Sequence, residues 1–86
     1  MANEASWYVY ILKCADNTLY TGITTDIERR INQHNNDNKL GAKYTRVRRP
    51  VKIVHQEKLS SRSLAGKREA AIKKLKRVDK ELLFKK

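Results

Sequence analysis

Two short aromatic segments separated by a polar turn place the strongest limit on how this chain can fold. Residues 7–13 (WYVYILK) and 18–23 (TLYTGI) are rich in aromatic and β-branched side chains, which favour strands. Asp16-Asn17 between them is a turn signal, because both side chains can hydrogen-bond to nearby backbone. The sequence therefore predicts a β-hairpin that carries three of the four tyrosines.

The register of this hairpin decides whether two of its tyrosines can act together. Side chains alternate between the faces of a sheet, so a register change of one residue turns a whole strand over. A two-residue loop at Asp16-Asn17 would pair Lys13 with Tyr20 and put Tyr10 and Tyr20 on opposite faces. A shared site requires an odd-length loop or a bulge, and we predict one of these.

The rest of the chain predicts two helices, one more strand and a short C-terminal helix. Thr25 or Asp26 can cap a helix that runs to about Asn35, with Ile27 and Ile31 on its buried side. Residues 35–49 are expected to form a loop that ends in a basic segment, and 51–56 to form a strand with Val51, Ile53 and His55 on one face.

A second long helix is expected from Ser60 or Ser61 to about Lys76. Its apolar face is predicted to contain Leu64, Ala71, Ile72 and Leu75, with Arg68 near the centre for no evident reason. A last turn or two over 78–84 would close the core with Leu82, Leu83 and Phe84.

The predicted fold class is α+β. The expected architecture is a small three-stranded antiparallel sheet flanked by helices, in the order ββαβα with a short C-terminal helix. We expect a single domain over residues 1–86 with its core at about 7–76.

The charge balance points to a polyanionic partner. Twenty Lys and Arg residues against nine Asp and Glu residues give a net charge of +11 and a pI near 10.1. Such a domain attracts nucleic acid, DNA above all, although a basic surface can also serve solubility alone. A membrane partner is disfavoured, because no long basic amphipathic helix and no membrane-spanning stretch is evident.

Cysteine usage and the N-terminus point to a cytoplasmic protein. Cys14 is the only cysteine, so an internal disulfide is impossible, and we expect it to pack as a small apolar side chain. No Cys/His cluster has zinc spacing. Met1 to Ser6 lacks the basic and apolar regions of a signal peptide.

Several residues then resemble the GIY-YIG nuclease domain in type, order and spacing. The resemblance runs from about Trp7 to Leu75 and rests on Tyr8-Val9-Tyr10, Tyr20-Thr21-Gly22, Arg30, His34 and Glu69. The segment Gly41–Val51 narrows it to small stand-alone bacterial GIY-YIG proteins (URI-type). Tyr8 departs from the pattern, because the family motif has glycine there.

The resemblance implies a divalent-metal-dependent endonuclease that cleaves DNA, structure-selective and linked to repair or recombination. Tyr10 and Tyr20 would supply phenols, with Tyr10 favoured as the general base, and Arg30 would hold the scissile phosphate. His34 would contact phosphate or water. Glu69 would bind Mg²⁺, with Mn²⁺ as a substitute.

A second set of residues is predicted to contact the nucleic acid. Cations would bind phosphates, one aromatic ring would stack on an exposed base, and a glycine would permit close approach; the set is Gly22, Lys43, Tyr44, Arg46, Arg48 and Arg49. The partner that would target the protein to DNA is not indicated by the sequence.

Structural explanations compete with each of these roles. The tyrosines could be ordinary strand residues, and His34 could be a packed or capping residue beside the apolar stripe. Arg30 could pair with Glu28 or Asp26, and Glu69 could be an i,i+4 partner of Lys73. The corresponding alternative is a nucleic-acid-binding module of the same fold with little or no catalysis. Such a module is expected to leave Glu69 paired with lysine and the two tyrosines apart.

Overall fold

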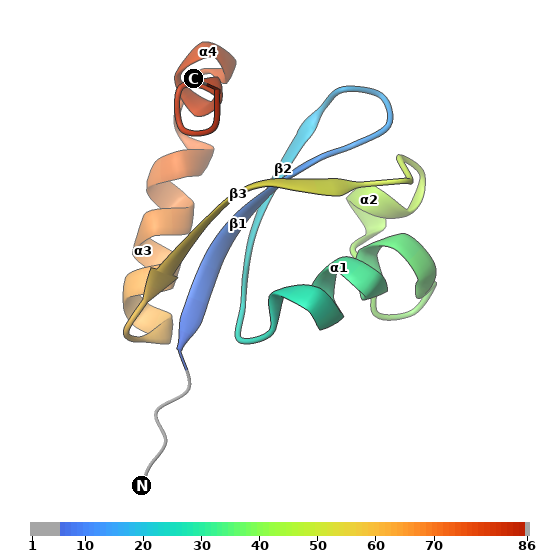
Figure 1. Cartoon of the computed structure of the whole chain (residues 1–86), viewed down its shortest axis with the longest axis horizontal. Helices are drawn as coiled ribbons and strands as arrows, with labels where there is room; N and C mark the ends of the chain where they lie inside the picture. Colours follow the sequence, from blue (N-terminus) through green and yellow to red (C-terminus); the bar gives the residue numbers. More distant parts are fainter. Residues whose placement is uncertain (1–5, 86) are drawn as a thin grey trace, which may run out of the picture.

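A three-stranded antiparallel sheet with helices on both faces forms the described part of the molecule, confirming the predicted α+β class. The structure, a computed structural model, describes residues 6–85; residues 1–5 and Lys86, which the domain and signal-peptide expectations include, lie outside them. The elements are β1 Trp7–Lys13, β2 Leu19–Thr24, α1 Ile27–Asn36, α2 Lys43–Arg46, β3 Lys52–Leu59, α3 Arg62–Lys73 and α4 Arg77–Glu81. The sheet order is β2-β1-β3 (Figure 1).

The hairpin turn has an odd length, as the requirement for a shared tyrosine face predicted. The Cys14 amide donates to the Thr18 carbonyl at 2.8 Å, which leaves a loop of three residues between them. Asn17 closes the loop with φ of 72°, a left-handed conformation that asparagine tolerates better than most residues. Lys13 therefore pairs with Leu19, and Tyr10 pairs with Gly22.

The two faces of the central strand β1 support separate halves of the core. Val9 and Ile11 are fully buried against Ala65 and Ile72 of α3. Tyr10, Leu12 and Cys14 point to the other face, where the isoleucines of α1 pack. Figure 1 shows α3 and α4 on one side of the sheet and α1 and α2 on the other. The burial of Cys14 agrees with its predicted packing role.

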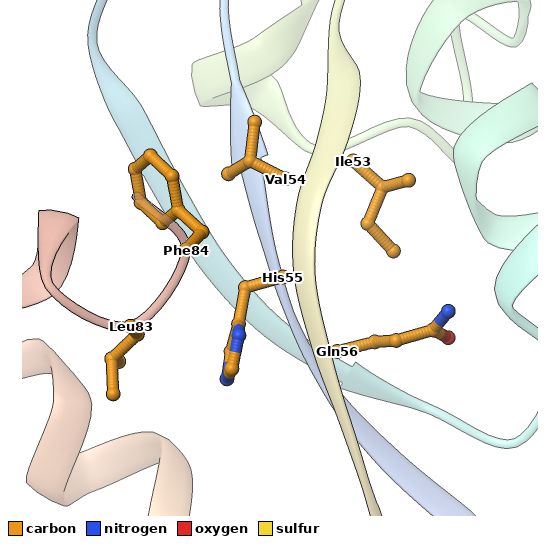
Figure 2. Close-up of a pocket in the computed structure, with 6 residues that line it drawn as sticks. All are labelled: Ile53, Val54, His55, Gln56, Leu83 and Phe84. Atoms are coloured by element: carbon orange, nitrogen blue, oxygen red, sulfur yellow. The ribbon is translucent and has the colours of Figure 1, made fainter. Parts of the chain in front are cut away.

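A bulge in β3 overturns the simple alternation expected for that strand. Ile11 of β1 pairs with His55 and Leu12 pairs with Ile53, so Val54 is an extra residue between them. An extra residue resets the alternation of the side chains that follow it. His55 consequently lies on the same side of β3 as Val54, Leu83 and Phe84, whereas Ile53 lies on the other side (Figure 2). A cavity of about 410 Å³ lies between this part of β3 and the C-terminal segment.

The buried face of α3 contains Ile72, as expected, but the other expected residues of this helix are not buried. Leu64 is 45% exposed and Ala71 is also exposed, whereas Ala65 and Ile72 are fully buried. Arg68 lies between these two on the helix, and its Nε and Nη2 donate to the Glu57 carboxylate on β3 at 2.8 and 2.9 Å. The bidentate ion pair explains why an arginine occupies the centre of an apolar stripe.

The N-terminal ends of the two long helices agree with the sequence, but α3 ends at Lys73 rather than at about Lys76, and the basic and C-terminal segments also differ. Asp26 and Ser61 cap α1 and α3 by accepting backbone N–H groups, as predicted. The expected loop contains the short helix α2, which its loop-like composition concealed. Leu82 is 72% exposed, so only Leu83 and Phe84 pack against the core.

Candidate active site

Tyr10 and Tyr20 lie on the same face of the hairpin, and their ring centroids are 6.4 Å apart. Tyr10 is 1% exposed, and its ring extends over Gly22 of the edge strand β2. A Cβ atom at Gly22 would lie 2.5 Å from the Tyr10 hydroxyl oxygen, so this position requires glycine. The close approach that the sequence suggested for Gly22 is therefore made by a phenol of the same protein. Gly22 is buried rather than presented to a ligand.

A line of three buried polar side chains runs from β1 through α1 to α2. The Tyr10 hydroxyl lies 2.8 Å from Nε2 of His34, and Nδ1 of His34 lies 2.8 Å from the hydroxyl of Thr45. The Thr45 hydroxyl in turn donates to the Ala42 carbonyl at 3.0 Å. His34 and Thr45 are both fully buried. Buried polar groups need such partners, because an unpaired one costs about 1–3 kcal/mol.

Burial keeps both Tyr10 and His34 uncharged at neutral pH. Desolvation raises the pKa of Tyr10 to about 12, although the nearby Arg30 guanidinium opposes the shift. Desolvation, followed by the charges of Arg30 and Arg49, lowers the pKa of His34 from 6.5 to about 4. A neutral imidazole has one nitrogen that accepts, so it can receive the phenol hydrogen. The raised pKa of Tyr10 is the opposite of what a phenolate base would require.

The lowered pKa of His34 predicts that the fold loses stability in mild acid. The unfolded imidazole binds a proton below about pH 6.5 and the folded one only near pH 4, so stability falls as pH falls through this window. The expected loss between pH 7 and pH 5 is about 2 kcal/mol. Urea unfolding of the wild type and His34→Gln at both pH values measures it. An equal pH dependence in the two proteins would contradict the prediction.

Arg30 lies beside this line and keeps part of its hydrogen-bonding capacity free. Its Nη1 donates to Gln33 Oε1 at 2.9 Å and to the Leu40 carbonyl at 2.7 Å. No ion pair with Glu28 or Asp26 occurs among residues 6–85, contrary to the competing explanation. The Arg30 side chain is also close enough to the Tyr10 hydroxyl to lower the pKa of that phenol through a hydrogen bond. A guanidinium has five N–H donors, so further donors remain for phosphate oxygens.

Glu69 on α3 pairs with Lys73 at 3.2 Å, the i,i+4 contact that its spacing allowed. The carboxylate is still close enough to Tyr10 for its charge to raise the pKa of the phenol, although this effect is smaller than those of burial, Arg30 and Tyr20. No group of three or more His, Cys, Asp or Glu side chains within residues 6–85 could hold a metal ion.

Two arginines of the basic segment donate hydrogen bonds to backbone carbonyls at the end of α1 and just after it. Arg49 donates to the carbonyls of His34 and Asp37 at 2.6 and 2.9 Å and to Asn38 Oδ1 at 2.9 Å, which satisfies the C-terminal end of α1. Arg46 donates to the Asn38 carbonyl at 2.7 Å from an exposed position. Lys43 is exposed and has no ion pair among residues 6–85.

The Tyr44 ring is engaged by neighbouring side chains. It stacks on Tyr20 with centroids 5.9 Å apart, and the Arg48 guanidinium carbon lies 3.9 Å from its centroid. Arg48 also pairs with Asp16 at 3.1 Å and donates to the Tyr44 carbonyl at 2.8 Å. Tyr44 thus extends the aromatic cluster to the surface, and stacking on a base would require these neighbours to move.

Sequence reasoning missed Thr45 and the carbonyl of Ala42. Thr45 sits among cations in a segment without helical or strand periodicity, so nothing marks it as buried. The only available signal was its place inside the segment Gly41–Val51 that carries the resemblance. Its partner His34 was identified, but its complete burial was not.

The fold and this cluster define a nuclease-type domain, and comparison agrees. The chain belongs to the family of the GIY-YIG catalytic domain, a nuclease family, which matches residues 6–81. GIY-YIG nucleases generally use divalent metals and act on nucleic acid. No helix in residues 6–85 is long and apolar enough to cross a membrane.

Similar proteins include several small UPF0213 proteins. The UPF0213 protein of Syntrophus aciditrophicus is 58% identical over 91% of this chain and 88% of its own length. DP2720 of Desulfotalea psychrophila is 58% identical over 96% of this chain and 74% of its own. The solution structure of EF2693 from Enterococcus faecalis has a TM-score of 0.62 at 48% identity, covering 95% of this chain and 85% of that one.

Proposed function

We propose that this chain is a divalent-metal-dependent endonuclease that hydrolyses phosphodiester bonds in DNA. The observation that carries the proposal is the buried 2.8 Å hydrogen bond between the Tyr10 phenol and the neutral His34 imidazole, next to Tyr20 and Arg30. Burying these polar groups together costs hydration that apolar residues would not have to give up. The arrangement is better explained by proton transfer than by packing.

The hydrogen bond supplies a route for the proton of the attacking water. In the proposed step, the water oxygen bonds to phosphorus while its proton passes to the Tyr10 oxygen. The phenol proton passes at the same time to Nε2 of His34, so Tyr10 never becomes a free phenolate. The bond from phosphorus to the leaving oxygen breaks, and solvent protonates that oxygen. This coupling avoids a free phenolate at Tyr10, whose pKa is about 12, and places the proton on an imidazole whose pKa is about 4, so the imidazolium can exist only transiently.

Arg30 would hold the phosphate through guanidinium N–H groups that the contacts to Gln33 and Leu40 leave available. Its Nη1 contacts to Gln33 and Leu40 fix the guanidinium in place before substrate binds. A prealigned cation stabilises the charge that develops on the phosphate without reorganising. Tyr20, less buried than Tyr10, would orient the water or a phosphate oxygen.

Glu69 would hold Mg²⁺, with Mn²⁺ as a substitute. A single carboxylate fits Mg²⁺, because this ion keeps several of its waters. The ion pair with Lys73, worth about 0.2–1 kcal/mol, is weak enough for a metal ion to replace the lysine. When bound, the ion supplies stabilisation of the negative charge on the leaving oxygen.

The net charge of +11 supports a nucleic-acid substrate, and we propose branched, flapped or single-stranded DNA in repair or recombination. The exposed Lys43 and Arg46 are the best placed to bind phosphates. Arg48 and Arg49 would act chiefly by holding the segment in shape.

Cleavage of labelled DNA tests the proposal. Branched, single-stranded and duplex substrates would be incubated with Mg²⁺ or Mn²⁺ and with wild type, Glu69→Gln or Glu81→Gln. Glu81 is the matched control, since it is also a helical carboxylate paired at i,i+4. We expect Glu69→Gln to lower kcat by about 10²-fold or more with DNA binding retained. The variant would no longer hold the metal ion that stabilises the negative charge on the leaving oxygen. Equal cutting by wild type and Glu69→Gln would indicate contamination and reject the proposal.

A binding module without catalysis remains the second candidate, and the Glu69–Lys73 ion pair favours it. The proximity of the Tyr10 and Tyr20 rings favours the enzyme, because a binding module was expected to leave the two tyrosines apart. DNA binding by the wild type with no metal-dependent cleavage of any substrate would select the module.

A further inference from the structure

We propose that Thr45 is a positioning residue, which holds His34 as the Nδ1–H tautomer so that Nε2 is free to accept the Tyr10 proton. The catalytic consequence rests on the proposed nuclease function. The tautomer itself is a property of the folded protein and can be measured without substrate.

The direction of the hydrogen bonds follows from the acceptor at the end of the line. The Ala42 carbonyl can only accept, and the Thr45 hydroxyl lies 3.0 Å from it. The single hydroxyl hydrogen is used in that bond, so Thr45 accepts from His34 rather than donating to it. Nδ1 therefore carries the hydrogen, and Nε2 presents a lone pair to the Tyr10 hydroxyl.

The opposite tautomer would reverse every bond in the line. Nε2–H would donate to the Tyr10 oxygen, and His34 could then not take up the phenol proton. Fixing the tautomer of an imidazole through its second nitrogen is how a neighbouring group controls its role as a base. Thr45 would also accept from the imidazolium formed during the proposed step.

Short local structure holds Thr45 in place. Its backbone N–H also donates to the Ala42 carbonyl, in the first turn of α2. Arg48 and Arg49 tie the segment that follows to Asp16 and to the end of α1. The basic segment therefore contributes a buried hydroxyl to the site in addition to its surface charge.

Nitrogen NMR of the whole protein tests the tautomer directly. The chain contains two histidines, so loss of one set of ring signals in His34→Gln assigns the other to His55. Long-range ¹H–¹⁵N spectra at pH 7 are expected to show a protonated Nδ1 and an unprotonated Nε2 for His34. A proton on Nε2 in the wild type would overturn the inference whatever the activity.

Variants then separate positioning from packing. Thr45→Val removes the hydroxyl at nearly equal volume, Thr45→Ser keeps it, and Thr21→Val is the control at another buried threonine. We expect only Thr45→Val to alter the His34 ring signals and to lower kcat by about 10²-fold, within the usual range for acid–base groups, with KM nearly unchanged.

The outcomes for the two proposals are distinct. A Thr45→Val protein with the same His34 ring signals and the same kcat as the wild type would overturn the positioning role. Thermal unfolding would show whether that variant folds. Expected spectra without any cleavage by the wild type would uphold the tautomer assignment and reject the nuclease function.

Discussion

Replacing Tyr10 with phenylalanine is expected to lower kcat for DNA cleavage by about 10²–10⁴-fold, the usual contribution of a general acid–base group. The change removes one oxygen and keeps the ring that packs in the core with Leu12 and Cys14. Without that oxygen the proton of the attacking water can no longer pass toward His34, whose Nε2 lies 2.8 Å from the Tyr10 oxygen. Single-turnover cleavage with saturating enzyme measures the loss without interference from product release.

Tyr8→Phe is the matched control, because it makes the same change two residues away on β1. We expect this variant to cleave at the wild-type rate. Tyr10→Phe leaves the His34 Nε2 without its partner, so a stability loss of about 1–3 kcal/mol should accompany the loss of activity. Unaltered cleavage by Tyr10→Phe would remove Tyr10 from the mechanism and leave Tyr20 as the remaining phenol.

Gly22→Ala is expected to be strongly damaging although it adds a single methyl group. The new Cβ would lie 2.5 Å from the Tyr10 hydroxyl oxygen and 2.7 Å from the ring carbon that bears it. The ring cannot remain where it is, so the hydrogen bond to His34 should break. Forcing extra volume into a packed site costs about 1–3 kcal/mol, and kcat should fall by at least the amount seen in Tyr10→Phe.

Gly66→Ala provides the control on the same backbone change. Apart from its chain neighbours and the adjacent backbone of α3, no described atom lies within 4 Å of a Cβ at Gly66. Alanine there should raise stability by about 0.5–1 kcal/mol, because glycine is a poor helix former. Thermal unfolding and cleavage of both variants measure the contrast. A Gly22→Ala protein with wild-type stability and activity would show that the Tyr10 ring is free to move.

The candidate active site could be predicted only in part from the sequence. Tyr10, Tyr20, Arg30 and His34 were identified through a resemblance, and the structure brings them close together. The internal contacts of the arginines in the basic segment were not foreseen, because a sequence cannot show which cations find carbonyl partners. Arg49, predicted to contact DNA, caps the end of α1 in the structure.

Much of the secondary structure of this protein could be predicted from the sequence alone, because it depends on short-range interactions. Strand propensity, the Asp26 and Ser61 caps and helical periodicity predicted the order of the main elements, because these signals act over a few residues. The net charge of +11 likewise follows from composition. The need for an odd hairpin loop was also deduced from the two tyrosines.

Only the tertiary structure decided what depends on contacts between distant segments. The bulge at Val54 moved His55 to the other face of β3, and the contact with Glu57 gave Arg68 its place in α3. Packing of α1 and α2 against one face of the sheet buried Tyr10 and His34 and so keeps both side chains neutral. The Thr45 hydroxyl reached His34 across eleven residues of chain, since a hydrogen bond depends on position in space and not on spacing in sequence.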